Sequence, residues 1–136
     1  MTANVPATRR IDEALKPRVV EFFAGIGLVR LAVEGQGFQV VFANDIDPKK
    51  EQIYRDNFGA EDFLLGDIHT LPSDKIPTAE LYTASFPCND LSIAGARAGL
   101  GGEHSSAFWG LIRILKAKAA AQEAPRFVLL ENVPGF

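Results

Sequence analysis

Two glycines in the segment FAGIG, residues 23–27, could let the backbone turn tightly and approach a ligand closely. The spacing departs from the dinucleotide pattern G-x-G-x-x-G, because Arg30 stands three positions after Gly27. A nucleoside ligand therefore suits this turn better than a pyrophosphate. A strand-to-helix turn without any ligand could have the same sequence, so the segment alone leaves both interpretations open.

Acidic residues follow two later hydrophobic runs. Asp45, in the segment NDID at residues 44–47, lies about 20 residues past the glycine turn, where a carboxylate can bond ribose hydroxyls. Ile46 is placed to lie against an adenine face, and Asp67, in GDI at residues 66–68, could accept a bond from the adenine amine. Together with the glycine turn, these residues predict one adenosine-shaped pocket. The alternatives are a capped turn with a solvated Asp45 and a surface turn at Asp67.

A thiol and a carboxyl group complete the set of reactive side chains. Cys88 is the one cysteine in the chain, and a lone cysteine is more often a buried core residue than a nucleophile. It follows Pro87 and precedes a glycine-rich segment, residues 89–103, which favours exposure and reactivity. Glu131 follows the apolar run 128–130, and we expect it to be half-buried, an environment that favours the protonated form of a carboxyl group. The pair predicts acid-assisted covalent catalysis.

These residues must be positioned by strands and helices. Hydrophobic runs bounded by turn residues predict strands at residues 18–24, 38–43, 63–65, 81–85 and 127–130. Helices are predicted at residues 28–34, 48–57 and 106–122. Asp47 should cap the second helix, with Pro48 at its first position. The apolar side of the last helix is predicted to contain Phe108, Trp109, Leu111, Ile112 and Leu115.

The alternation of strands and helices predicts an α/β domain with a parallel sheet and helices on both faces. Ligands in such sheets bind beyond the carboxyl ends of the strands, and every residue discussed above follows a predicted strand. A chain of 136 residues fits one domain. We expect residues 1–17 to be a lead-in and residues 18–136 to form the domain.

Composition limits the function classes. Hydrophobic residues make up 47% and charged residues 23%, as in ordinary globular proteins. One cysteine allows no intrachain disulfide, and the sequence contains no apolar run of membrane-spanning length and no signal peptide, so the cytoplasm is the expected location. The net charge of −3 is unlike that of a self-sufficient nucleic-acid binder. Either the chain does not bind DNA, or a basic surface lies on another part.

In combination, these segments resemble the motifs of the DNA cytosine-C5 methyltransferase family. The matching segments, which stand in the family's order, are EFFAGIG at 21–27, NDID at 44–47, GDI at 66–68, FPC at 86–88 with LS at 91–92, and ENV at 131–133. Each motif is common, but five in this order and spacing are specific. The resemblance covers residues 18–136.

The resemblance implies a Rossmann-like S-adenosylmethionine-dependent methyltransferase sheet, truncated after its fifth strand. The implied cofactor-binding residues are Phe23, Ala24, Gly25, Gly27, Asp45, Ile46, Asp67, Ile68 and Pro87. Cys88 would add to C6 of a cytosine flipped from the duplex, while Glu131 would donate a hydrogen bond or proton at N3. Ser92 and Asn132 would bind the substrate. No metal is implied.

The resemblance also implies double-stranded DNA as substrate and a role in restriction-modification. The family's Arg-x-Arg segment and target-recognition domain have no counterpart in this sequence, so we expect a complementing C-terminal polypeptide or missing domain. Three positions depart from the family pattern: Asn89 replaces glutamine, His104 replaces a frequent arginine, and Asp45 replaces glutamate. Two alternatives remain open, a tRNA cytosine-C5 methyltransferase of the same family and an inactive remnant that binds cofactor or a partner.

Overall fold

Five short hydrophobic runs pair side by side as parallel strands, in the spatial order β3-β2-β1-β4-β5. The computed structural model describes residues 15–86 and 106–132. Its strands are β1 (Arg18–Phe22), β2 (Gln39–Asp45), β3 (Phe63–Leu65), β4 (Leu81–Ala84) and β5 (Phe127–Leu130). Their bounds confirm the predicted strands to within about two residues, and β2 extends beyond its predicted end to include Asp45.

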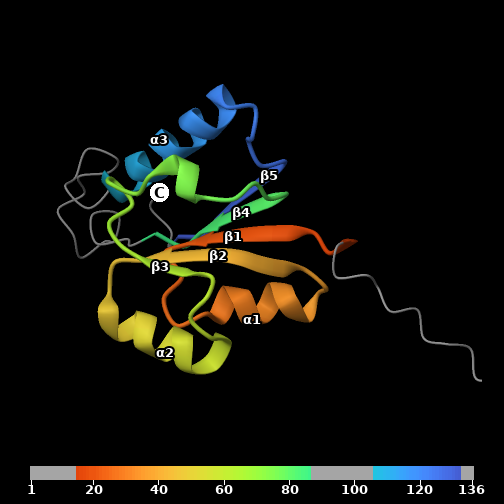
Figure 1. Cartoon of the computed structure of the whole chain (residues 1–136), viewed down its shortest axis with the longest axis vertical. Helices are drawn as coiled ribbons and strands as arrows, with labels where there is room; N and C mark the ends of the chain where they lie inside the picture. The colour runs from red at the N-terminus through yellow and green to blue at the C-terminus, as the bar shows by residue number, and fades with distance from the viewer. Residues whose placement is uncertain (1–14, 87–105, 133–136) are drawn as a thin grey trace, which may run out of the picture.

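Helices cover both faces of the sheet, as the alternating pattern predicts (Figure 1). One face carries α1 (Leu28–Gly35) and α2 (Pro48–Phe58), and the other carries α3 (Ser106–Ala120). A short 3₁₀ helix, η2 (Ser73–Lys75), lies between β3 and β4. The cap of α2 is confirmed, because Asp47 Oδ1 accepts hydrogen bonds from the backbone N–H groups of Lys49 and Lys50 at 2.8 and 3.4 Å.

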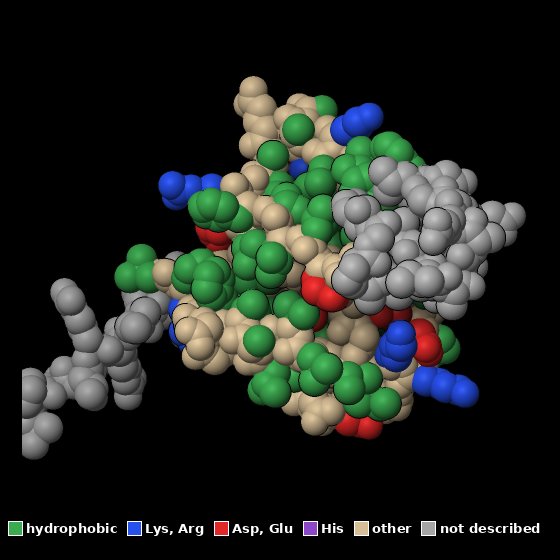
Figure 2. Space-filling view, turned by 180° about the vertical axis from the view of Figure 1, so that it is seen from behind, with side chains coloured by type: hydrophobic (Ala, Val, Ile, Leu, Met, Phe, Trp, Pro, Cys, Tyr) green, Lys and Arg blue, Asp and Glu red, His purple; other side chains and the backbone are tan. Residues whose placement is uncertain are grey.

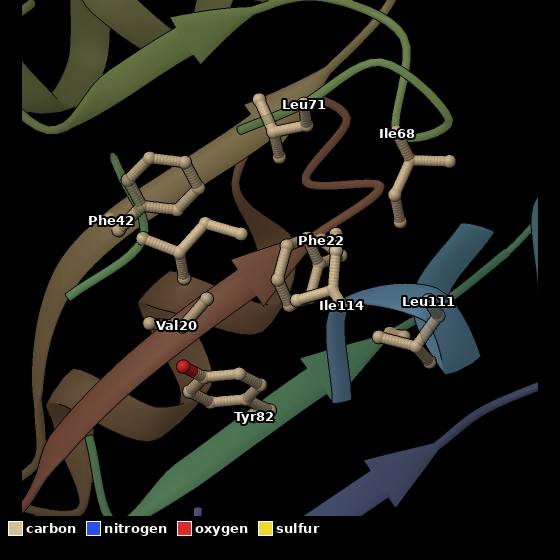
Figure 3. Packing of buried hydrophobic residues seen from close by; sticks show 10 residues of the cluster. Val20, Phe22, Phe42, Ile68, Leu71, Tyr82, Leu111 and Ile114 are labelled. Atoms are coloured by element: carbon tan, nitrogen blue, oxygen red, sulfur yellow. The ribbon is translucent and has the colours of Figure 1, made fainter. Parts of the chain in front are cut away.

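The main core lies between the sheet and α3. Its side chains come from three strands, the segment after β3, and α3, and they point toward one another (Figure 3). The labelled members are Val20, Phe22, Phe42, Ile68, Leu71, Tyr82, Leu111 and Ile114. Trp109 does not belong to this face, contrary to the prediction, and 51% of it is exposed. Trp109 stands two positions before Leu111, which is a rotation of about 200° around the helix. It therefore points away from the core side, which Leu111 and Ile114 occupy.

A smaller core fills the opposite side, beneath α1 and α2. It contains Ala24, Ala43, Tyr54 and Phe63, with Phe58 packed against it. β5 lies at the edge of the sheet opposite β3, and it differs from the other strands because all four of its residues are exposed. Within the described ranges, no helix has the length and apolar character needed to cross a membrane.

Replacing Gly27 by alanine is expected to destabilise the fold by about 2–3 kcal/mol. Gly27 has φ +93°, and a Cβ atom there would lie 2.3 Å from Cε2 of Phe58. Gly37→Ala is the matched control, because Gly37 has φ +88° but nothing within 4 Å of the added carbon. In urea unfolding, Gly37→Ala should lose only about 1 kcal/mol of stability, the cost of placing a side chain at a positive φ. Equal losses in both variants would contradict a close packing of Phe58 against the turn.

Candidate functional site

The sheet reverses its strand order at β1, which lies between β2 on one side and β4 on the other. Ligands of open α/β sheets bind at such a point, beyond the carboxyl ends of the strands. A pocket of about 520 Å³ opens there, within the range of small-molecule sites. It is lined by Phe23, Ala24, Gly25, Ile26, Leu28, Val29, Lys50, Ser85 and Glu131.

The turn after β1 has an unusual backbone. Phe23 adopts the left-handed conformation at φ 54°, which is uncommon for a bulky side chain and is found most often at functional sites. Its ring packs edge-on against Phe86, with the centroids 6.3 Å apart. The next residue is held to β2, because the Ala24 N–H donates to the carbonyl of Asn44 at 3.0 Å. The structure therefore fixes the turn between two strand ends.

Asp45 binds this same turn through its side chain. Its Oδ2 accepts a hydrogen bond from the Gly25 N–H at 2.8 Å, and its Oδ1 accepts one from the Asp47 N–H at 3.0 Å. The residue is buried, with 7% of its surface exposed. Each carboxylate oxygen can accept a further bond, so both turn contacts leave capacity for ribose hydroxyls. Ile46 beside it is exposed, as an adenine contact would require. Both roles stay predictions.

Asp67 follows β3, at the same edge of the sheet. Its Oδ1 accepts bonds from the backbone N–H of His69 at 2.9 Å and lies 2.7 Å from Nδ1 of the His69 ring. These contacts, the backbone bond first, lower the pKa of Asp67 and keep it an acceptor. The neighbouring Ile68 side chain lies in the core, and a Cβ at Gly110 of α3 would come within 2.6 Å of it. Only the backbone of Ile68 therefore remains for the predicted cofactor contact.

Glu131 lines the pocket from the end of β5. Its N–H donates to the carbonyl of Ala84 at 3.0 Å, which holds it beside the end of β4. The expected half-burial is not found: Glu131 is exposed, because it follows β5, an edge strand whose four residues are all exposed. Asn132 follows it and is partly buried. The predicted site residues Pro87, Cys88 and Ser92, with the segment 89–103, lie outside the described residues.

A buried polar network lies under the turn, on the side of α1 and α2. Glu21 of β1 accepts a hydrogen bond from the hydroxyl of Tyr54 at 3.2 Å, and Arg30 of α1 donates to that hydroxyl at 3.4 Å. Arg30 also pairs with Glu34 at 3.0 Å and with Asp62 at 3.5 Å. Burial raises the pKa of Glu21 to about 7, against the lowering effects of the Tyr54 bond and the nearby Arg30. The network joins β1 to both helices.

Sequence reasoning missed several contributors to the site. Asn44 is buried, and its amide Nδ2 donates to the carbonyls of Leu64 and Gly66 at 2.8 and 3.0 Å, which ties β2 to β3. An asparagine at a strand end beside the expected ribose carboxylate was the available signal. Lys50 and Ser85 line the pocket, but nothing in their local sequence indicates it. No group of three potential metal-ligating residues occurs in the described part of the chain.

Comparison with known proteins places these motifs in a family. The family model of the C-5 cytosine-specific DNA methylase matches residues 17–136. The type II methyltransferase M.HaeII of Haemophilus aegyptius is 37% identical over 116 residues, which is 85% of this chain and 34% of that protein. M.HhaI of Haemophilus parahaemolyticus is 34% identical over 119 residues, 88% of this chain and 34% of that protein. The chain thus spans about a third of the length of these relatives.

Solved structures show the same architecture. The S. pombe Dnmt2 methyltransferase superposes with a TM-score of 0.67 at 29% identity, covering 89% of this chain and 37% of that one. The methyltransferase EhMeth of Entamoeba histolytica gives a TM-score of 0.71 at 23% identity, covering 88% of this chain and 38% of that one. The match to EhMeth is evidence for the fold and for nothing beyond it. The predicted Rossmann-like methyltransferase sheet with helices on both faces is therefore confirmed.

Proposed function

The chain belongs to the C-5 cytosine-specific DNA methylase family, and from this we propose that it supplies the cofactor-binding and catalytic part of a DNA cytosine-C5 methyltransferase. One observation carries the proposal. One pocket is lined both by the β1 turn, which should hold the methyl donor, and by Glu131, whose carboxyl group should meet the cytosine. A methyl transfer needs donor and acceptor side by side, and two strand ends that share a pocket allow this.

The residues present fit S-adenosylmethionine. The pocket beside Gly25 is lined mainly by apolar groups, and a Cβ at Gly25 would have nothing within 4 Å, so the backbone faces open space. Exposed Ile46 offers an apolar surface for an adenine, while Asp45 and Asp67 offer acceptors for ribose hydroxyls and an amine. When bound, the cofactor supplies an electrophilic methyl group. No metal takes part in this proposal.

Cys88 is the proposed nucleophile. Its thiolate adds to C6 of a cytosine rotated out of the duplex, while Glu131 holds a proton at N3 so that the ring accepts the electron pair. The addition makes C5 nucleophilic, and C5 takes the methyl group. Loss of the C5 proton to a base then reforms the C5–C6 double bond and expels the thiolate of Cys88. Asn132 and Ser92 are proposed to contact the cytosine.

Double-stranded DNA is the proposed substrate, and a second polypeptide or further domain is the proposed partner. All four β5 side chains are hydrophobic and exposed, led by Phe127 at 60% and Leu129 at 54%. Exposed hydrophobic residues of α1, including Leu28 and Leu31, add to the apolar surface. Seen from behind, hydrophobic side chains gather across the middle of the molecule (Figure 2). An exposed apolar strand edge of this kind favours pairing with further polypeptide.

We expect S-adenosylmethionine to bind the chain weakly and Asp67→Ala to weaken binding further, because the variant loses the acceptor for the adenine amine. A lost hydrogen bond to a charged group corresponds to a roughly tenfold or greater loss of affinity. Isothermal titration calorimetry measures both proteins. Asp74→Ala is the control, since Asp74 is an acidic residue of η2 that belongs to none of the predicted cofactor motifs. Equal heats for the Asp67 variant and the unaltered chain would remove Asp67 from the site.

We expect the purified chain to transfer no methyl groups to DNA by itself. Phosphate neutralisation dominates DNA affinity, and this chain carries a net charge of −3. Flipping a base costs a few kcal/mol, which contacts from a recognition domain must offset. Tritiated-methyl transfer to mixed-sequence duplex DNA is the measurement, with and without a polypeptide that carries such a domain. Robust labelling at C5 by the chain alone would contradict this expectation, and tRNA in the same assay tests the alternative substrate.

A further inference from the structure

The pocket at the β1 turn contains one basic side chain among the described residues that line it. Lys50 projects from the first turn of α2, and Glu131 is the one other charged side chain of the lining. The remaining lining residues are apolar apart from Ser85 and the backbone. Lys50 is exposed, so it lies at the rim of the pocket, where its ammonium group can attract an anion although water screens part of the attraction.

The first turn of α1 adds to the positive character of this pocket. Leu28 and Val29 of that turn line it, so the amino-terminal end of the helix adjoins the same space. Gly27 is its N-cap and offers no side-chain bond, and no acidic residue stands in the first turn. The unsatisfied N–H groups at such an end favour a negative charge. Both features therefore predict that the ligand carries an anionic group here.

The helix that carries Lys50 gives no local reason for a lysine. Cations are disfavoured at the amino-terminal end of a helix, and the favourable acidic cap of α2 is already supplied by Asp47. Lys49 stands in the same turn and makes the same backbone contact with Asp47, but it does not line the pocket. The two lysines can therefore be compared directly, because they differ mainly in whether they line the pocket.

We propose that the ammonium group of Lys50 binds the carboxylate at the amino-acid end of the cofactor, an inference that rests on the proposed S-adenosylmethionine site. That carboxylate is the one anionic group of the ligand. Asp45 and Asp67, the proposed contacts of the adenosine end, are not among the residues that line this pocket. With the adenosine placed beside them, the pocket that Lys50 lines is left for the amino-acid end. Lys50 then acts as a positioning residue that fixes the direction of the bound cofactor.

The test compares two ligands on the full chain by ligand-observed NMR titration, which measures weak binding. S-adenosylhomocysteine keeps the amino-acid end, and 5′-methylthioadenosine lacks it. Lys50→Met should weaken S-adenosylhomocysteine binding by up to about fivefold, the effect of an exposed ion pair, and leave methylthioadenosine binding unchanged. Lys49→Met should change neither affinity. Added salt should weaken S-adenosylhomocysteine binding to the unaltered chain and should have less effect on Lys50→Met.

Each other outcome overturns the inference in a distinguishable way. If Lys50→Met binds S-adenosylhomocysteine as tightly as the unaltered chain, the carboxylate contact is wrong and the cofactor site still stands. If the variant loses both ligands equally, Lys50 shapes the pocket instead of binding the carboxylate. If the unaltered chain binds neither ligand, the proposed cofactor site fails and the role of Lys50 fails with it.

Discussion

Replacing Cys88 by alanine is expected to lower methyl transfer by at least about 10³-fold in enzyme reconstituted with a recognition-domain polypeptide. The proposed reaction begins with attack of the thiolate on C6, and alanine has no group that can form this bond. Loss of a nucleophile from a covalent mechanism is among the largest effects of a single substitution. Transfer of tritiated methyl groups to duplex DNA is the measurement.

Two controls separate chemistry from binding. Cys88→Ala should bind S-adenosylhomocysteine as the unaltered chain does, because the thiol of Cys88 is not among the proposed cofactor contacts, and alanine changes none of them. Glu131→Gln should lose less activity, about 10²-fold, since it removes a proton donor and keeps the nucleophile. Substantial turnover by Cys88→Ala would rule out covalent catalysis through this thiol.

A substrate with fluorine at C5 gives a second measurement of the same step. The proposed reaction ends with loss of a proton from C5, and fluorine cannot leave in this way, so the thioether between Cys88 and C6 should persist. Denaturing electrophoresis should show a protein–DNA adduct with the reconstituted enzyme and none with Cys88→Ala. An adduct of equal yield in the alanine variant would place the nucleophile at another residue.

Much of this fold follows from local sequence patterns. The strands are short runs of β-branched and aromatic residues between turn residues, and the cap at Asp47 with Pro48 fixes the start of α2. The parallel sheet follows from alternation of strands and helices. The family motifs mark the strand ends, and this is why Phe23, Gly25 and Glu131 could be assigned to one region that the structure brings around one pocket.

The errors came from properties that depend on tertiary packing. Trp109 has an apolar side chain, but its direction depends on which face of α3 meets the sheet. Glu131 was expected to be half-buried from the apolar run before it, and the position of β5 at the sheet edge leaves it exposed. Ile68 is a predicted cofactor residue whose side chain packs under α3, so the sequence did not indicate that only its backbone is left for such a contact. Local sequence does not determine burial of this kind.

The pocket also contains residues that no motif marks. Lys50 reaches it from a helix that follows a different strand, and Ser85 reaches it from the end of β4. Asp45 lies at the end of β2, as the sequence predicts. The sequence could not predict the hydrogen bond that Asp45 accepts from the Gly25 N–H. These contacts join segments that are distant along the chain, so they are known only once the strand order is known.

The free energy of unfolding is expected to fall by about 3 kcal/mol between pH 4.5 and pH 8 through Glu21 alone. Burial raises the pKa of Glu21 to about 7 from its ordinary value of 4.5. Between these two values the unfolded chain releases the proton while the folded chain keeps it. The folded state therefore loses relative stability as the pH rises, and the loss is complete above the folded pKa. Below 4.5 both states are protonated, and the full stability is present.

Glu21→Gln isolates this effect, because the amide stays neutral at every pH and its oxygen can still accept the Tyr54 hydroxyl. Urea unfolding at several pH values measures the free energy of unfolding of both proteins. Relative to the unaltered chain, that of the variant should rise by about 3 kcal/mol from pH 4.5 to pH 8, with most of the rise below pH 7.

Glu34→Gln is the control, since Glu34 pairs with the same Arg30 but is partly exposed. If Glu34→Gln reproduces the gain, the charge balance around Arg30 and not the burial of Glu21 is responsible. Parallel curves for Glu21→Gln and the unaltered chain would show that Glu21 is ionised in the folded protein near its ordinary pKa. In that case the network would have to stabilise a buried anion although one of its oxygens, Oε1, accepts no bond from any described residue.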